Sequence, residues 1–245
     1  MDPEGFTLHQ TADGTGTLYS SKMQESYHSL NGAAQESRHV FIEAGLKQCP
    51  ATSIHVFEIG FGTGLNALLT WGEAKRDHLD VTYTAVEAYP LPLETTASLG
   101  YESLEPLLTK DAFSNLHVSP WECPVVLEKG CFTLCKLKGD FTTQNLTDTF
   151  DLIYFDAFAP DKQPEMWEEP LFAALYASMN ENGILVTYCA KGEVRRRLQR
   201  CGFLVERIPG PPGKREMLRA IKTTLQNEKK TVAESPSRAK NIILG

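Results

Sequence analysis

The order of apolar and polar positions predicts alternating strands and helices along most of the chain. Apolar or β-branched runs predict strands at residues 54–59, 81–87, 125–128, 132–137, 150–156 and 183–189. Helical spacing predicts helices at residues 36–48, 65–76, 91–99, 102–109, 165–179 and 191–200. Residues 203–208 and 216–221 predict an antiparallel hairpin, and residues 113–124 are predicted to be loop. This order predicts the α/β class: a Rossmann-like, mostly parallel, doubly wound sheet with a C-terminal antiparallel hairpin.

The two ends of the chain differ from this central part. Residues 1–35 are polar and rich in Gly, Ser and Thr, and we expect an extension that forms a short hairpin or a lid. Residues 36–222 are expected to form the main domain. Residues 223–245 lose apolar content and gain Lys, Glu, Ser and Asn, so a disordered tail is expected there.

Composition is that of a globular protein, with 42% hydrophobic and 22% charged residues among 245. No apolar stretch approaches the ~20 residues of a membrane span, and the acidic N-terminus does not resemble a signal peptide. Six cysteines form no C-x-x-C pair, so we expect neither a disulfide framework nor a metal site. These features favour the reducing cytoplasm, with no membrane partner.

The net charge of −7 argues at first against a nucleic-acid partner, but the charges are unevenly distributed. Residues 190–222 contain ten Lys or Arg and only three Glu. A basic segment on an acidic chain is typical of a localised anion-binding face. Arg195-Arg196-Arg197 taken alone favours a solvated helix face, whereas Lys214-Arg215, in a loop rich in Gly and Pro, is the stronger candidate for an anion contact.

A glycine-rich turn follows the first apolar strand. Gly60, Gly62 and Gly64 would let the backbone turn sharply and approach a ligand closely, at the edge of the sheet where α/β folds bind ligands. A dinucleotide fingerprint requires G-x-G-x-x-G, but here the spacing is G-x-G-x-G, with Leu65 in place of the third glycine. This spacing favours the glycine loop of S-adenosyl-L-methionine methyltransferases.

Two further strand ends carry acids that could contact an adenosine. Glu87 ends the strand after the glycine loop, where a carboxylate can accept hydrogen bonds from both ribose hydroxyls. Asp140 follows another strand and could bind the adenine amino group. The alternative for Glu87 is a solvated acid, and for Asp140 it is a Gly-Asp turn.

Asp156 follows the most apolar strand, across the expected switch point from the glycine loop. Its carboxylate could take a proton from an amine, or orient that amine for methyl transfer. Phe158 could form an apolar wall or stack on a base. The alternative for Asp156 is a helix cap or a turn-forming residue before Ala-Phe-Ala-Pro.

The blocks F-G-T-G-L-N (61–66) and D-x-F-A-P-x-K-x-P-x-M-W (156–167) are more specific than a glycine loop. With residues 35–41, 86–91, 192–198 and 213–218, they make the chain resemble the methyltransferase part of the bifunctional tRNA wobble-uridine enzymes of the MnmC family and their stand-alone relatives. The resemblance covers roughly residues 8 to 221 and implies a class I methyltransferase fold. It also implies transfer of a methyl group from S-adenosyl-L-methionine to the exocyclic amine of 5-aminomethyl-(2-thio)uridine in the tRNA anticodon.

The resemblance also implies roles for particular residues. Asp156 matches the catalytic carboxylate, and Lys214 and Arg215 match a basic motif that faces tRNA. Gly60, Gly62, Glu87 and Asp140 match the family's cofactor contacts, and the full set of residues expected to bind the cofactor adds Glu58, Gly64, Asn66, Asp156 and Phe158. Arg195 and Arg196 are added to the expected RNA-binding set. No metal ligand is expected.

The chain departs from the family in two respects. Ala157 stands where the family has Gly in the D-x-F-A-P block. No second dinucleotide fingerprint marks a flavin oxidase domain, so a separate enzyme system is expected to supply the aminomethyl substrate. Two alternatives remain: an N-methyltransferase of a small-molecule or protein amine, and a catalytically silent module of the same fold that binds RNA or a partner.

Overall fold

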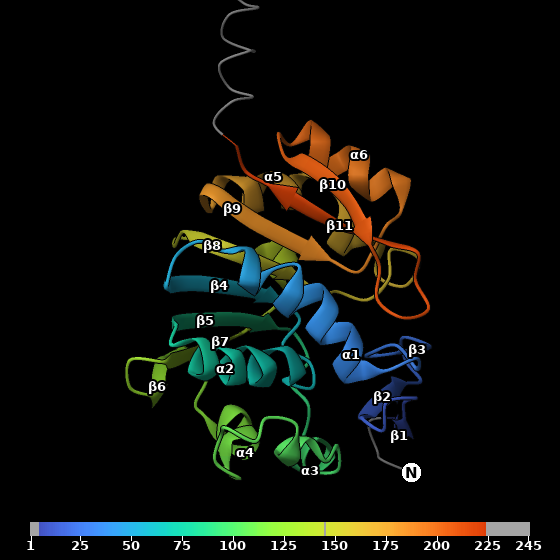
Figure 1. The fold of residues 1–245 in the computed structure, drawn as a ribbon. Helices are drawn as coiled ribbons and strands as arrows, with labels where there is room; N and C mark the ends of the chain where they lie inside the picture. The colour runs from blue at the N-terminus through green and yellow to red at the C-terminus, as the bar shows by residue number, and fades with distance from the viewer. Residues whose placement is uncertain (1–4, 145, 224–245) are drawn as a thin grey trace, which may run out of the picture.

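The computed structural model describes residues 5–144 and 146–223 and contains an eight-stranded sheet in the order β10-β11-β9-β8-β4-β5-β7-β6 (Figure 1). Its strands are β4 (Ser53–Ile59), β5 (Asp80–Glu87), β6 (Pro124–Glu128), β7 (Phe132–Lys138), β8 (Phe150–Phe155), β9 (Met179–Thr187), β10 (Leu204–Pro209) and β11 (Glu216–Ile221). Strands β9, β8, β4, β5 and β7 run parallel, and β10, β11 and β6 add antiparallel edges. The predicted sheet and C-terminal hairpin are confirmed.

The strand order places a topological switch point at β4. The chain passes from β4 to β5 and β7 on one side, and from β8 to β9 on the other. The connections after β4 and β8 therefore diverge, which opens a crevice at the carboxyl ends of these two strands. The glycine loop follows β4 and Asp156 follows β8, so both enter this crevice.

The helices are α1 (Ala33–Ser37), α2 (Leu65–Asp77), α3 (Leu93–Ala97), α4 (Ala112–Val118), α5 (Glu169–Ala177) and α6 (Gly192–Arg200). A π-helical turn, Arg38–Glu43, continues α1. Helices on both faces explain the continuous apolar runs, because alternate residues of one strand enter different cores. Leu152 packs in the core that contains α2, and Ile153 packs in the core that contains α5 and α6.

The N-terminal residues form a separate three-stranded antiparallel sheet of β1 (Phe6–Gln10), β2 (Gly16–Ser20) and β3 (Glu25–Ser26). The predicted hairpin is therefore present, and Figure 1 shows the small sheet beside α1. The Tyr101 hydroxyl donates to Gly16 O at 2.7 Å, and Ala33 N donates to Thr11 Oγ1 at 3.2 Å. These bonds attach the small sheet to the main domain.

Three sequence predictions of local structure were wrong. Residues 112–118 form α4 rather than loop; this helix is too short to show a clear period, yet it buries Phe113 and Leu116. Residues 102–109 are not a helix, because Pro106 cannot donate a helical hydrogen bond, and a short 3-10 turn at Tyr101–Ser103 takes its place. The helix expected at residues 165–179 divides at Glu168 into a 3-10 turn and α5. The tail prediction for residues 223–245 lies almost wholly outside the described residues.

Candidate active site

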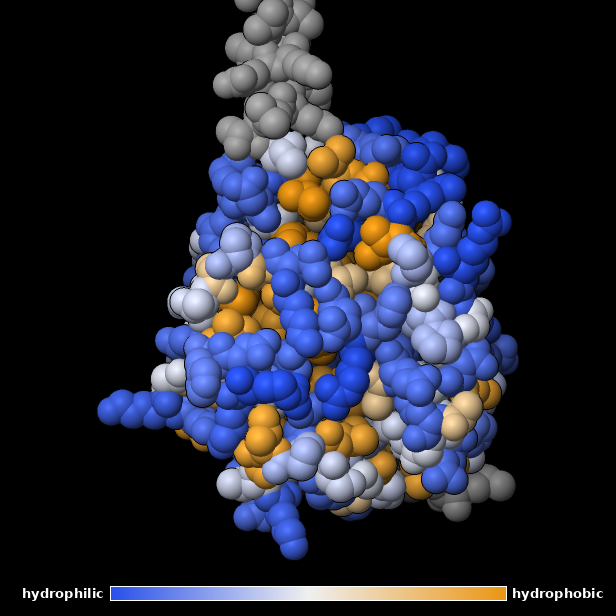
Figure 2. All heavy atoms as spheres, viewed as in Figure 1, coloured by the Kyte–Doolittle hydropathy of each residue, from blue (hydrophilic) through white to orange (hydrophobic). Residues whose placement is uncertain are grey.

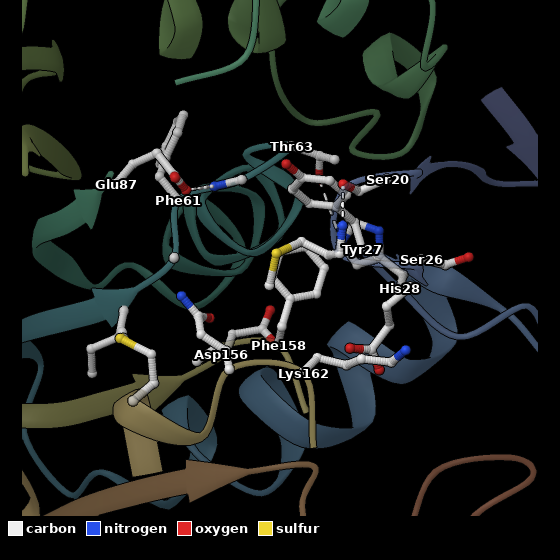
Figure 3. Close-up of a pocket in the computed structure, with 18 of the residues that line it drawn as sticks. Ser20, Ser26, Tyr27, His28, Phe61, Thr63, Glu87, Asp156, Phe158 and Lys162 are labelled. Carbon is white, nitrogen blue, oxygen red and sulfur yellow. Dashed lines mark hydrogen bonds between the residues drawn. The ribbon is translucent and has the colours of Figure 1, made fainter. Parts of the chain in front are cut away.

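A cavity of about 860 Å³ lies at the carboxyl ends of β4, β5 and β8. Its floor is formed by the glycine loop and the segment after β8, and the N-terminal sheet contributes the opposite wall. In Figure 3, Tyr27 and His28 from the N-terminal segment lie across the cavity from Asp156, with Glu87 on another side, and the Phe158 ring lies beside Tyr27. Seven of the predicted site residues line this cavity: Gly60, Gly62, Glu87, Asp140, Asp156, Phe158 and Lys214.

The glycine loop has the backbone that its sequence predicts. Gly60, Gly62 and Gly64 have φ values of 93°, 49° and 74°, which side chains rarely adopt. A Cβ on Gly60 would lie 3.1 Å from Asp156 O, and one on Gly62 would lie 3.2 Å from the Tyr27 ring. Gly64 faces away from the cavity, where a Cβ would lie 2.9 Å from His117 Nε2. Gly64 therefore serves the turn into α2.

Glu87 is held by backbone donors at the end of β5. Its Oε2 accepts from Gly62 N at 2.9 Å, and its Oε1 accepts from Tyr89 N at 2.8 Å. Each carboxylate oxygen can accept a further bond, so the group can still receive two hydroxyls. The same bonds tie the glycine loop to β5.

Asp140 forms the turn that was its alternative interpretation. Its Oδ1 accepts from Thr142 N and from Thr142 Oγ1, both at 2.8 Å, and so caps the 3-10 turn Phe141–Thr143. The residue is exposed and lines the cavity. The turn bonds use Oδ1, which leaves Oδ2 as an acceptor for a ligand.

Asp156 is an acid that lines the cavity and has a strongly perturbed pKa. Burial raises its pKa to about 7, while a hydrogen bond from Asn66 Nδ2 to Oδ2, at 2.8 Å, opposes that rise. The charge of Glu36 raises the pKa further, and that of Lys214 lowers it. Asp156 keeps partial contact with the cavity. A carboxyl group of this kind can gain and lose a proton near neutral pH.

Hydrogen bonds to the backbone hold the segment after Asp156. The Tyr188 hydroxyl donates to Ala157 O at 2.9 Å, and Trp167 Nε1 donates to Phe158 O at 2.8 Å. Ala157 does not have a positive φ, so the family's Gly is not required for this backbone. The Phe158 ring makes an edge contact with Tyr27 at 5.2 Å between centroids.

The N-terminal segment supplies cavity residues that sequence reasoning missed. Glu25 Oε2 accepts from Ala159 N at 3.2 Å, which joins the small sheet to the segment after β8. The His28 ring lies between Thr17 Oγ1, at 3.1 Å, and Thr63 Oγ1, at 3.4 Å, and burial lowers its pKa to about 4. The sequence signal for this packing is the set of larger apolar and aromatic residues in a polar stretch, Leu18, Tyr19 and Tyr27.

Lys214 lies on the cavity wall. Its Nζ donates to Glu36 Oε1 at 2.5 Å and lies 4.1 Å from the centroid of the Tyr188 ring. Glu36 Oε2 accepts from Ser29 N at 2.8 Å. The neighbouring Arg215 is exposed, so the two residues of the predicted basic motif have different surroundings.

Much of the basic charge at residues 190–222 is paired with acids. Arg196 pairs with Glu193 at 2.8 Å, and Arg200 pairs with Glu169 at 2.7 Å. Arg195 and Arg196 lie on α6 and do not line the cavity, and Figure 2 shows a strongly hydrophilic surface over that helix. The arginines of α6 are therefore separate from the chemical site.

Glu58 and Asn66 also lie outside the cavity lining, since both are buried beneath its floor. Within the ranges 5–144 and 146–223, no group of three His, Cys, Asp or Glu side chains is arranged to hold a metal ion. Over the same residues, no helix is both long and apolar enough to cross a membrane.

The sequence is similar to known proteins over most of its length. Residues 129–223 match the family described as S-adenosyl-L-methionine-dependent methyltransferase. The tRNA 5-methylaminomethyl-2-thiouridine biosynthesis bifunctional protein MnmC of Burkholderia thailandensis is 32% identical over 220 residues, which are 83% of this chain and 33% of that protein. MnmC of Magnetococcus marinus is 34% identical over 219 residues, 84% of this chain and 32% of its own length. The chain is a homologue of part of MnmC.

The chain spans about a third of the length of these MnmC relatives. Among solved structures, MnmC2 from Aquifex aeolicus superimposes with a TM-score of 0.68 at 24% identity, covering 98% of this chain and 80% of its own. Spermidine synthase from Thermotoga maritima shares the fold, with a TM-score of 0.55 at 12% identity, covering 96% and 77%. These findings confirm the predicted resemblance to MnmC, the fold class and S-adenosyl-L-methionine as the cofactor.

Proposed function

We propose that the protein transfers a methyl group from S-adenosyl-L-methionine to the exocyclic amine of 5-aminomethyl-(2-thio)uridine at the wobble position of tRNA. The relatives named for 5-methylaminomethyl-2-thiouridine biosynthesis support the product. The observation that carries the proposal is Asp156, a carboxyl group with a pKa raised to about 7 that lines the cavity beside the glycine loop.

The cavity fits the proposed cofactor in shape and in donor set. Gly60 and Gly62 present backbone without side chains to the cavity, so a ligand can approach closely. In our proposal Glu87 accepts the ribose hydroxyls and Asp140 accepts the adenine amino group through Oδ2. Phe158 would then form the apolar wall near the methyl group.

Bound S-adenosyl-L-methionine supplies the methyl group: the amine lone pair forms the new N–C bond as the S–C bond breaks, and a neutral thioether leaves. A primary alkyl amine is mostly protonated at neutral pH, so its lone pair must first be freed. We assign Asp156 to accept that proton, because its raised pKa brings it close to the working pH. Asp156 would also orient the nitrogen through the same hydrogen bond.

We assign tRNA to the face that carries Arg215, with Arg195 and Arg196 as outer contacts. Arg215 is exposed and lies in the loop that also brings Lys214 to the cavity. A phosphate contact there would hold the anticodon over the cavity mouth. Lys214, paired with Glu36, is better suited to contact the base than the phosphate backbone.

The proposal is tested by incubating the purified protein with isotope-labelled S-adenosyl-L-methionine and tRNA that carries 5-aminomethyl-2-thiouridine. Mass spectrometry of the nucleosides should show one labelled methyl group on that nucleoside. The matched control is the same tRNA with unmodified uridine, which should stay unlabelled. Labelling of free alkyl amines, without labelling of tRNA, would contradict the tRNA substrate and favour a small-molecule enzyme.

A further inference from the structure

Glu58 and Asn66 form a hydrogen-bonded chain that ends on Asp156. Asn66 Nδ2 donates to Glu58 Oε1 at 2.9 Å and to Asp156 Oδ2 at 2.8 Å. Both hydrogens of the Asn66 amide are therefore committed, one to each acid. The three residues come from the end of β4, the first turn of α2 and the segment after β8, so the chain links the elements that meet at the switch point.

Neither Glu58 nor Asn66 can reach a ligand directly. Their exposed fractions are 1% and 4%, and neither lines the cavity. The buried Glu58 carboxyl also lies next to the Tyr83 hydroxyl, which is itself fully enclosed. Burial raises the pKa of Glu58 well above its usual value, which favours its uncharged form. An enclosed acid that does not line the cavity is poorly placed to bind the cationic part of a cofactor.

We propose that Asn66, itself oriented by Glu58, is a positioning residue that fixes the Asp156 carboxylate for proton transfer, rather than a cofactor ligand. This inference rests on the proposed function of Asp156. With Oδ2 bound to Asn66, Oδ1 is the oxygen that accepts no bond from a described side chain, so Oδ1 is the one assigned to receive the proton of the amine.

The Asn66 donor also sets the charge balance around Asp156. The other ionisable groups near Asp156 come from several elements: Glu58 from β4, Tyr83 from β5, Glu36 from α1, Tyr188 after β9 and Lys214 from the loop before β11. Of these groups, Glu36 disfavours a negative charge on Asp156, and Lys214, which favours it, already pairs with Glu36. The Asn66 amide is then the hydrogen-bond donor that favours the charged form of Asp156.

The test uses Asn66→Leu, Asn66→Asp and Glu58→Gln. Leu keeps the volume but removes both donors, and Asp replaces the donor by an acid in case the Leu variant fails to fold. Thr70→Val is the matched control, because Thr70 is equally buried on α2 and its Oγ1 lies 3.2 Å from the Tyr154 hydroxyl, a bond remote from Asp156. A ¹³C NMR titration of the Asp156 carboxyl, assigned from the Asp156→Asn spectrum, gives the midpoint of its ionisation and needs no tRNA substrate. Calorimetry gives the affinity for S-adenosyl-L-methionine.

Asn66→Leu and Asn66→Asp should each raise the Asp156 midpoint by about one unit or more, because the charged form loses its donor. Their affinity for S-adenosyl-L-methionine should change less than about threefold. Glu58→Gln keeps an acceptor for the Asn66 amide. In this variant, as in Thr70→Val, the Asp156 midpoint and the affinity for S-adenosyl-L-methionine should stay close to wild type. An unchanged midpoint combined with a tenfold loss of affinity in the Asn66 or Glu58 variants would overturn the proposal. Because the titration needs no tRNA, failure to methylate tRNA would refute the proposed function without altering this result.

Discussion

The carboxyl ends of β5 and β8 each present an acid to the same cavity, but the two acids have different surroundings. Glu87 accepts backbone N–H bonds at both oxygens, from Gly62 and Tyr89. Asp156 accepts one side-chain bond, lies near Glu36, and has its pKa raised to about 7. A carboxylate with donors on both oxygens suits a fixed binding contact, whereas one with few donors can exchange a proton. In our proposal, equivalent strand-end positions therefore serve binding or chemistry according to the donors around them.

The largest effect is expected from Asp156→Asn, which removes the proton acceptor but keeps the shape. Turnover on tRNA should fall by about 10²–10⁴-fold, the usual contribution of a general base. Affinity for S-adenosyl-L-methionine, measured by calorimetry, should change little. Asp161→Asn is the control, since that nearby acid pairs with Lys191 and is 79% exposed. Wild-type turnover in Asp156→Asn would remove its chemical role.

Glu87→Ala should act on binding instead. The variant loses an acceptor for two hydroxyls and the anchor of the glycine loop. Its affinity for S-adenosyl-L-methionine should therefore fall by about 10–100-fold. Turnover should recover largely when the cofactor is raised to saturation, because the group has no part in proton transfer. Calorimetry on Glu87→Ala and Glu87→Gln measures this directly. Normal affinity in both variants would eliminate the ribose assignment.

The comparison also predicts a pH-dependent stability effect. Because Asp156 holds its proton more tightly in the folded protein than in the unfolded chain, wild-type stability falls as pH rises from about 4 to about 7. Asp156→Asn lacks this loss. Its free energy of unfolding, relative to that of wild type, should therefore increase by up to about 4 kcal/mol between pH 4 and pH 8. Urea unfolding at both pH values measures the difference. An equal effect at the two values would show that the pKa of Asp156 is not raised.

Arg215→Ala is expected to have the smallest effect. Losing one exposed phosphate contact should weaken tRNA binding by a few-fold and lower the salt slope of binding by about one. Lys214→Ala combined with Arg215→Ala should weaken tRNA binding further and leave the affinity for S-adenosyl-L-methionine unchanged. Fluorescence titrations across a salt series measure both quantities. Equal loss of tRNA and cofactor affinity would assign the pair to the cofactor site.

The sequence predicted those parts of the site that depend on local pattern. The run Ile54–Ile59, the glycine spacing and the run ending at Asp156 identify strands and turns whose positions in the sheet follow from α/β topology. Glu87 and Asp140 were identified because they directly follow strands. In each case the relevant information lies within a few consecutive residues.

The remaining parts depend on contacts between distant segments, which no local pattern encodes. Glu36 and Lys214 are 178 positions apart, and only the packing of the β10–β11 loop against α1 brings them together. The positions of Tyr27 and His28 depend on how the N-terminal sheet packs beside the crevice. Glu58 and Asn66 were predicted to bind the cofactor, and only side-chain burial places them beneath the floor.

The central claim is that Asp156 accepts the proton of the substrate amine. The most direct measurement is the single-turnover rate of methyl transfer to 5-aminomethyl-2-thiouridine tRNA from pH 5.5 to 9, for wild type and Asp156→Asn. The wild-type rate should rise with pH, with a midpoint near the Asp156 pKa of about 7, and the variant should be slow and lack this midpoint. A profile of the same shape and height in both proteins would contradict the claim.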